Sequence, residues 1–206
     1  MRTELRDGSG RLVELETEPA TIEDEAEASA AGLRLRRRID QLRIGLPLAT
    51  PAPPLTTRPF IPGRDDEAFL AVNNRAFGWH PDQSNWTIED LRRRMGEPWF
   101  DPGGFLLHEI DGTLAGFCWT KVHPATATDP VLGEIFVIAV DPAFHGRGLG
   151  RALTLAGLDH LAEQSIGVGM LHVEHDNHVA IALYQDIGFT EHDAHCWWSI
   201  DAASER

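Results

Sequence analysis

The chemistry of this 206-residue sequence gathers in one stretch, residues 133–152, which holds a carboxylate, an apolar run and a glycine-rich turn. Glu134 begins the run 134–140, whose apolar and β-branched residues predict a buried strand. Burying a carboxylate without a partner costs free energy. We therefore expect Glu134 either at the rim of a cavity or as a working base with a raised pKa.

The turn that follows this strand has the features of an anion site. Asp141-Pro142 ends the strand, because proline cannot donate to a ladder and restricts the residue before it. The segment HGRGLG (145–150) then opens onto a predicted helix over 148–164, where free N–H groups and the positive end of the helix dipole meet. The spacing matches neither the G-x-G-x-x-G dinucleotide pattern nor a Walker loop. It predicts a different phosphate or pyrophosphate ligand.

Composition limits the partners that this chain can have. The formal net charge is −14, which argues against non-specific binding to nucleic acid or to an anionic membrane. We find no signal peptide and no apolar run long enough to span a bilayer. The two cysteines stand in unrelated contexts, which favours a reducing, cytoplasmic setting over a disulfide framework.

The first 50 residues differ in character from the rest. They predict a strand over 12–18, a helix over 22–31 that Gly32 ends, and a basic amphipathic segment over 33–46 for which we favour a strand over a short helix. A stiff proline-rich linker follows at 47–56. One strand–helix–strand fragment cannot form a core alone, so it must dock on something or stay partly disordered. We expect a domain fragment over 1–50 and a separate domain over 57–206.

The second region reads as one α+β domain with a mixed central sheet flanked by helices. Its predicted helices cover 65–77 with Asp65 or Asp66 as cap, a segment that Thr87 begins with a capping box, 148–164, and 177–187 closed by Gly188. Its predicted strands cover 57–61, 105–110 and 114–122 around an Asp111-Gly112 hairpin turn, 134–140, 170–174, and a final pair of strands within 189–200.

The glycine turn resembles the acetyl-CoA motif of the GNAT acetyltransferases, Q/R-x-x-G-x-G/A, with His145 where Gln or Arg is usual. The resemblance implies the GNAT fold and acetyl-CoA as co-substrate, with no metal. Tyr184 lies in the Y-x-x-x-G-F context in which GNAT enzymes often carry the general acid for the coenzyme sulfur; the alternative for this residue is packing with a surface hydroxyl. Backbone N–H groups near Ile138 to Val140 would polarise the thioester carbonyl.

Further segments resemble the mycothiol synthase family: VNNRAFGWHPDQSNWT, WFDPGG, GFCWTKVH and GEIFVIAVDP, with similarity over about residues 58–200. That family acetylates the cysteinyl amine of cysteinyl-glucosaminyl-inositol. The resemblance implies Glu134 as base, Tyr184 as acid, and substrate contacts from Asp82, Lys121, Glu134 and His172. It implies coenzyme contacts from Ile138, Ala139, Val140, His145, Gly146, Arg147, Gly148, Leu149, Gly150, Arg151, Asn177, His178, Val179, Ala180, Ile181 and Ala182.

The sequence departs from that family in three ways. Asp82 replaces the usual Glu, and His172 stands where a substrate-facing Tyr is usual. The family has two tandem GNAT domains, whereas residues 12–46 resemble only the closing piece of the first. We therefore expect a chain shortened at its N-terminus, acting as a monomer or with a partner that completes the missing half.

Other interpretations remain open at this stage. His172, His175 and His178 lie three apart, followed by His192, His195 and Cys196, but this spacing is poor for a zinc site. The chain can instead acetylate another small-molecule amine, or be a non-catalytic module that binds acetyl-CoA. Cys118 on an apolar strand reads as core rather than as a nucleophile, so we expect no covalent enzyme intermediate.

Overall fold

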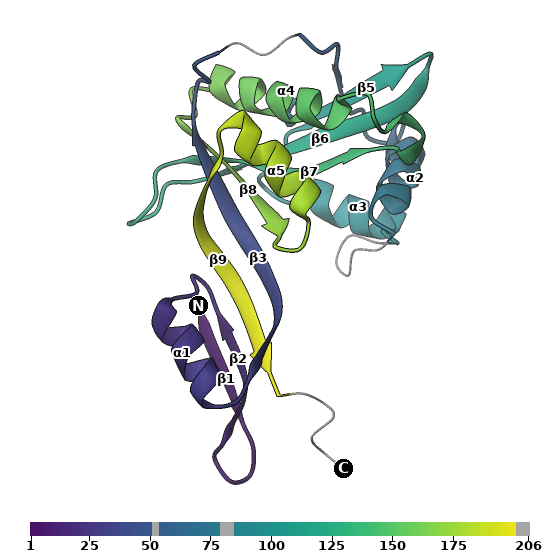
Figure 1. The fold of residues 1–206 in the computed structure, drawn as a ribbon. Helices are drawn as coiled ribbons and strands as arrows, with labels where there is room; N and C mark the ends of the chain where they lie inside the picture. The colour runs from purple at the N-terminus through teal and green to yellow at the C-terminus, as the bar shows by residue number, and fades with distance from the viewer. Residues whose placement is uncertain (51–53, 79–84, 201–206) are drawn as a thin grey trace. The chain divides into compact units, whose positions relative to one another are not determined.

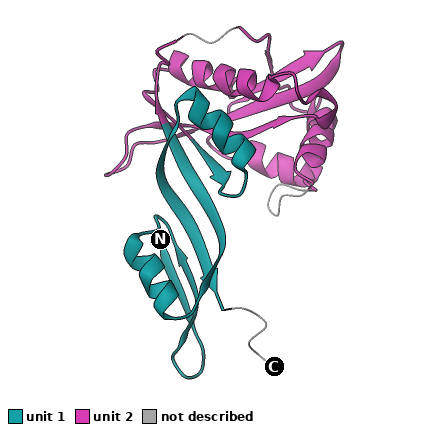
Figure 2. Ribbon diagram, viewed as in Figure 1, with its two compact units in different colours: residues 1–43, 171–206 teal, residues 44–170 magenta. Residues whose placement is uncertain are grey.

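The structure is a computed structural model that describes residues 1–50, 54–78 and 85–200 (Figure 1). The chain forms two compact units, coloured separately in Figure 2. Unit 1 comprises residues 1–43 and 171–206, and unit 2 comprises residues 44–170. Each unit is described by itself below.

Unit 2 is built on antiparallel strands that pair in the order β4 (Arg58–Pro59), β5 (Phe105–Ile110), β6 (Thr113–His123) and β7 (Leu132–Val140). β7 also pairs in parallel with the first residues of β8 (Val168–Glu174). The predicted β5–β6 hairpin is confirmed: Asp111 and Gly112 both have positive φ, 51° and 75°, as a tight turn between antiparallel strands requires.

Helices cover both faces of these strands. α4 (Leu149–Glu163) packs on β6 and β7, where Gly157 lies against the side chains of Cys118 and Ile135. A side chain at this glycine would collide with both, so the close approach of helix and sheet depends on it. The other face carries α2 (Asp66–Ala76) and α3 (Ile88–Met95), and its aromatic-rich core contains Phe60, Phe69, Trp86, Leu91, Phe105, Phe117, Trp119 and Val137.

The local signals for these helices were correct with one exception. Thr87 forms the predicted capping box with Asp90. Asp65 occupies the N-cap position of α2 but makes no side-chain cap bond there; its carboxylate pairs with Arg58 and accepts from the Ile61 N–H instead. The ion pair with Arg58 therefore replaces the side-chain cap of the helix. Short 3-10 turns complete the unit at Pro102–Gly104 and Pro142–Phe144.

A β-bulge sets the register at the centre of unit 2. Trp119 lies opposite Val137 and Thr120 opposite Ile135, so Phe136 of β7 has no residue opposite it on β6. Beyond this bulge Lys121 lies directly opposite Glu134. Residues directly opposite each other point to the same face of a sheet, so the register places Lys121 beside Glu134.

Unit 1 contains β1 (Arg2–Arg6), β2 (Leu12–Thr17), α1 (Ile22–Ala30), most of β3 (Arg34–Gly45), the end of β8, α5 (His178–Ile187) and β9 (Thr190–Ser199). β9 pairs antiparallel with β2 on one side and β3 on the other. The predicted strand–helix–strand of the first 50 residues is therefore present. It shares a core with β9, formed by Leu12, Leu15, Ala28, Leu33, Ala194, Cys196 and Trp198.

Two features of unit 1 differ from expectation. Residues 189–200 contain one strand, β9, rather than a pair. A bulge leaves His192 unpaired between Asp193 and Glu191, and the strand continues through it. The strand Arg2–Arg6 was not anticipated, since its exposed residues lack apolar alternation. Residues 51–53 of the predicted proline-rich linker lie outside the described residues.

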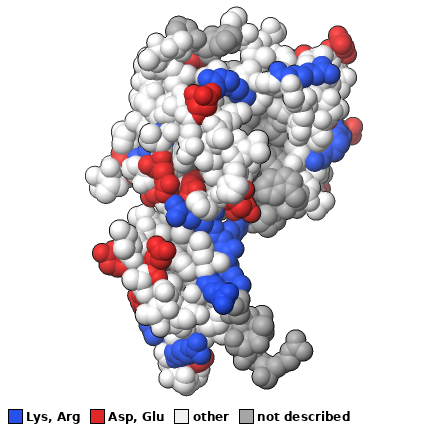
Figure 3. Space-filling model, in the orientation of Figure 1, with Lys and Arg blue, Asp and Glu red and all other residues white. Residues whose placement is uncertain are grey.

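Basic side chains of β3 give unit 1 a positively charged run, visible in Figure 3 over the part where β3 lies in Figure 1. Arg37 pairs with Glu174 at 2.6 Å, and Arg38 pairs with Asp40 and Glu191, each at 2.6 Å. Much of this charge is thus neutralised within the unit. No helix in the described part of the chain is long and apolar enough to cross a membrane.

Candidate active site

Glu134 is buried at the start of β7, with 6% of its surface exposed, and it has a partner. Its Oε2 lies 2.7 Å from Nε2 of His123 at the end of β6. The carboxylate is therefore buried together with a hydrogen-bond partner. A hydrogen-bond donor offsets part of the cost of burying the charge and keeps the group able to accept a proton.

Lys121 stands next to Glu134 on the same face of the sheet. Its ammonium nitrogen lies 4.9 Å from the centre of the Trp99 ring and 5.3 Å from that of Phe136, both within the range of cation–π contacts. Lys121 is half-buried rather than a solvated strand end. The site around Glu134 thus combines a carboxylate, an imidazole and an ammonium beside an aromatic wall.

The predicted coenzyme loop follows directly from the other end of β7. Gly146 and Gly148 have φ of 76° and 73°, and Gly148 is the N-cap of α4 with no side-chain cap bond to its first turn. A Cβ at either glycine would meet nothing within 4 Å, so the backbone here faces open space. Helix N–H groups without a cap, on an open loop with exposed Arg147 and Arg151, fit the phosphates of a coenzyme.

Two side chains hold this loop to the end of β7. Nε2 of His145 lies 3.1 Å from the carbonyl oxygen of Val140 and donates to it. Asp141 accepts from the N–H of Ala143 at 2.9 Å and pairs with Arg75 of α2. Burial alone would raise the pKa of Asp141, but these hydrogen bonds outweigh it and hold the pKa below its usual range. The loop geometry therefore rests on an ionised aspartate.

Ile138, Ala139 and Val140 pair with Cys118, Phe117 and Gly116 of β6 on one edge of β7. Alternate residues of a strand direct their N–H groups to opposite edges, so some of these groups point away from β6. The recorded pairing of β7 with β8 covers Gly133 and Glu134. That this segment of β7 binds the thioester stays a prediction.

Tyr184, His172 and the predicted coenzyme contacts 177–182 lie in unit 1. Tyr184 is buried on α5, with its ring 5.7 Å from that of Phe189 in an edge-to-face contact. Asn177 caps α5 by accepting from the N–H of Ala180, and Gly188 closes the helix with φ 114°, the closure that the sequence predicts. His172 is exposed on β8, where its Nε2 lies 3.3 Å from Nε2 of Gln41. Asp82 lies outside the described residues.

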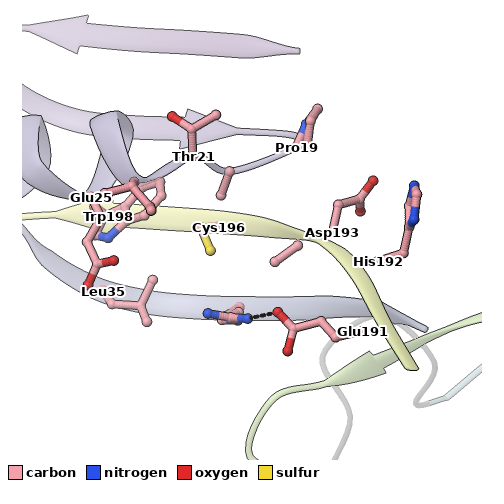
Figure 4. Close-up of a pocket in the computed structure, with 13 residues that line it drawn as sticks. Pro19, Thr21, Glu25, Leu35, Glu191, His192, Asp193, Cys196 and Trp198 are labelled. Carbon is pink, nitrogen blue, oxygen red and sulfur yellow. Dashed lines mark hydrogen bonds and ion pairs between the residues drawn. The ribbon is translucent and has the colours of Figure 1, made fainter. Parts of the chain in front are cut away.

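Other features of the structure bear on the alternatives. Among the residues that the structure describes, no group of three or more His, Cys, Asp or Glu is placed to hold a metal ion. Unit 1 has a cavity of about 550 Å³ between the start of α1 and β9, lined in part by Thr21, Glu25, Cys196 and Trp198 (Figure 4). None of the predicted site residues lines it. Cys118 is fully buried, and this burial raises the pKa of its thiol to about 12, as suits a core residue.

Sequence reasoning assigned no role to His123, although it ends the GFCWTKVH segment. One signal was available: residues two apart on a strand share a face, so His123 must lie on the same face as Lys121. The missing information was the register between β6 and β7. The bulge at Phe136 fixes that register and brings His123 to Glu134.

Comparison with known proteins identifies the family. The family model described as Acetyltransferase (GNAT) family matches residues 70–189, more than half of the chain. The chain therefore belongs to the GNAT acetyltransferase family. A crystal structure of a GCN5-related N-acetyltransferase from Sphaerobacter thermophilus shares the fold, with a TM-score of 0.69 and 24% identity over 86% of this chain and 56% of that one.

Curated relatives are similar at the level of sequence. The mycothiol acetyltransferase of Thermobispora bispora is 48% identical over 184 residues, which cover 86% of this chain and 60% of the relative. The mycothiol acetyltransferase of Acidimicrobium ferrooxidans is 51% identical over 180 residues, which cover 84% of this chain and 58% of the relative. The chain thus matches about 60% of the length of these relatives.

Proposed function

We propose that this chain is an N-acetyltransferase that moves the acetyl group of acetyl-CoA to a primary amine, and that the amine is the cysteinyl nitrogen of cysteinyl-glucosaminyl-inositol. Membership of the GNAT family supports the reaction. Identity near 50% to proteins named mycothiol acetyltransferase supports the acceptor. We further propose that residues 57–206 form the catalytic domain and that the reaction takes place in the cytoplasm.

One observation carries the proposal: a single strand joins the base to the coenzyme loop. Glu134 is buried at the start of β7, and the loop with the uncapped helix N-terminus follows its end at Val140. A rigid strand fixes the separation between proton acceptor and phosphate site, which is what positioning catalysis needs. A simple strand–turn–helix would need neither the buried carboxylate nor the open glycines.

The reaction needs three tasks, and the chain offers a group for each. The acceptor ammonium loses a proton to the carboxylate of Glu134, and the free amine then attacks the thioester carbon. N–H groups of β7 near Ala139 stabilise the negative charge on the carbonyl oxygen. The C–S bond breaks, and the departing coenzyme thiolate takes a proton from the hydroxyl of Tyr184. The nitrogen of the adduct gives up its second proton through solvent, which restores the Tyr184 hydroxyl. The products are the amide and the free thiol of the coenzyme, with no covalent enzyme intermediate.

Residues that would recognise the acceptor are polar or cationic. We propose that Lys121, Asp82 and His172 bond the hydroxyl groups of the sugar and inositol, because ammonium, carboxylate and imidazole groups all form hydrogen bonds with hydroxyls. Asn177 to Ala182 and His145 to Arg151 would contact the coenzyme. Light scattering with and without acetyl-CoA measures the molar mass in solution, which distinguishes a monomer from a complex with a partner.

A second candidate is a GNAT enzyme for a different small-molecule amine. His172 favours it, because an exposed imidazole that contacts Gln41 offers a different surface from the aromatic hydroxyl that the mycothiol synthase resemblance leads one to expect. The two candidates share Glu134 and the coenzyme loop, so only the choice of acceptor separates them.

The test measures acetyl-CoA consumption with cysteinyl-glucosaminyl-inositol for the wild type and for Glu134→Gln. We expect turnover that falls at least about a hundredfold in the variant, because a general base contributes on the order of 10²–10⁴ to the rate. Glu163→Gln, an exposed carboxylate at the end of α4, is the matched control. Binding of acetyl-CoA without turnover of this acceptor would exclude the mycothiol assignment, and turnover of another amine would establish the second candidate.

A further inference from the structure

We propose that His123 is a positioning residue for the reaction: it holds the carboxylate of Glu134 ionised and oriented toward the amine. The inference rests on the proposed function, in which Glu134 is the base, and adds a residue for which the sequence predicted no role. It concerns unit 2 alone, since both residues lie there.

The contact between His123 and Glu134 is short, and the imidazole is more exposed to solvent than the carboxylate. Nε2 of His123 and Oε2 of Glu134 are 2.7 Å apart, and their side chains are 31% and 9% exposed. A carboxylate oxygen accepts, so Nε2 of the imidazole carries a proton and donates it. The imidazole therefore reaches from solvent to a carboxylate that solvent scarcely touches.

The register makes this contact a property of the fold rather than of a side-chain rotamer alone. His123 lies opposite Leu132 and Lys121 lies opposite Glu134, so His123 and Lys121 flank the carboxylate from β6. The bulge at Phe136 sets this alignment. A shift of one residue would turn both polar side chains to the face covered by α4.

In the described part of unit 2, two polar side chains of β6, Lys121 and His123, lie beside Glu134. The neighbours of Glu134 on the same face of β7 are the apolar Leu132 and Phe136. Met170 lies opposite it on β8. The Lys121 ammonium is held over the rings of Trp99 and Phe136. A hydrogen bond to the charged form of a carboxylate favours that form, so loss of the imidazole favours the protonated acid.

The experiment compares two substitutions of this histidine with a matched control. His123→Phe keeps an aromatic ring but removes the donor, whereas His123→Gln keeps an amide N–H donor that does not titrate. His108→Phe is the control: this histidine lies on β5 of the same unit and contacts the backbone oxygen of Thr56 at 2.8 Å. For each protein we would measure kcat/KM against pH with cysteinyl-glucosaminyl-inositol, the Kd for acetyl-CoA, and the thermal midpoint.

We expect His123→Phe to lose about tenfold or more in kcat/KM at pH 7, with the acidic limb of the profile moved to higher pH. His123→Gln should recover part of the rate, and acetyl-CoA should bind all variants equally. A merely structural role would lower the thermal midpoint without moving the limb. ¹⁵N spectra of the imidazoles add a readout without turnover: the Nε2–H signal of His123 should shift in Glu134→Gln.

Two results would overturn the inference, and they differ from failure of the proposed function. His123→Phe with the wild-type profile, in an assay in which Glu134→Gln is inactive, would remove the positioning role and leave the function standing. A His123 signal unmoved by Glu134→Gln would remove the contact itself. If the wild type turned over no amine at all, the proposed function would fail first and the positioning role with it. If His123→Phe did not fold, His123→Gln and the spectra would decide.

Discussion

The carboxylate of Asp40 on β3 accepts a hydrogen bond from Nδ1 of His175 at 2.7 Å, and so connects the N-terminal part of the chain to the turn between β8 and α5. The N–H of His175 also donates to the backbone oxygen of Arg38 at 2.9 Å. Within unit 1, then, β3 holds the turn that leads to Asn177, the cap of α5. Residues that the sequence presents as a separate fragment support the helix that carries Tyr184.

Asp40→Ala should loosen this turn. Asp40 is 3% exposed and also pairs with Arg38 at 2.6 Å, so its removal leaves two donors without their buried acceptor. We expect a loss of about 1–3 kcal/mol in the free energy of unfolding and faster hydrogen exchange in residues 172–182. Asp176→Ala, an exposed carboxylate in the same turn, is the control. Equal exchange in the two variants would contradict the supporting role of β3.

We expect the ion pair between Asp65 and Arg58 in unit 2 to weaken in acid. Burial alone would raise its pKa, but hydrogen bonds from Arg58, Arg64 and the Ile61 N–H outweigh that effect and hold the pKa at about 2. A pKa lowered by folding stabilises the protein above the unfolded value near 3.8, and this contribution is lost as pH falls from there toward 2.

Asp65→Asn should therefore destabilise the protein by about 2 kcal/mol at pH 7, and the difference from the wild type should shrink as pH falls below about 4. Glu109→Gln is the matched control, because Glu109 pairs with the same Arg58 but is 37% exposed. We expect it to cost less than about 1 kcal/mol. Urea unfolding at several pH values measures both. If the free energy of unfolding of Asp65→Asn differed from that of the wild type by the same amount at every pH, the stabilisation by Asp65 would not be electrostatic.

Cys118 tests the absence of a covalent intermediate. Full burial raises the pKa of its thiol to about 12, so almost no thiolate forms at neutral pH. Cys118→Ala should keep turnover within about threefold of the wild type while losing about 1 kcal/mol of stability to the small cavity. Mass spectrometry of the enzyme after acetyl-CoA addition should find no acetyl group on this residue. An acetylated Cys118, or an inactive but folded variant, would require a two-step transfer.

Local signals predicted much of the fold, because a few neighbouring residues decide each of them. The Asp111-Gly112 turn, the Thr87 capping box and the Gly188 closure all satisfy backbone groups within a few residues of themselves. The long-range features were not predicted. The pairing of β9 with both β2 and β3 depends on strands more than 140 residues away in sequence, and nothing local in 189–200 distinguishes one bulged strand from two.

The candidate site also combines features that local sequence predicts with features that depend on the pairing of distant strands. Gly148 as the start of α4 was predicted from spacing, since a helix beginning after glycines is a local property. The partner of Glu134 was not, because it depends on where the β6–β7 register slips by one residue, and the bulge at Phe136 has no sequence signature of its own. The contact of Asp40 with His175 likewise joins residues 135 apart in sequence.

Gly148 offers the sharpest test of the coenzyme loop. Its φ of 73° lies in the left-handed region, and a Cβ there would meet nothing within 4 Å. Gly148→Ala therefore introduces backbone strain of about 1–2 kcal/mol without a steric collision. The strained loop should relax, which misaligns the first N–H groups of α4 and raises the Kd for acetyl-CoA by about tenfold, as 1.4 kcal/mol predicts.

Gly167→Ala separates this effect from the general cost of replacing a glycine. Gly167 lies after α4 in the same unit, has equally open space around it, and does not have a positive φ. Calorimetric titration with acetyl-CoA should give the wild-type Kd for Gly167→Ala and a weaker one for Gly148→Ala. If both variants bound acetyl-CoA as the wild type does while Gly148→Ala was less stable, the glycine would serve the turn alone and the phosphates would have to bind elsewhere.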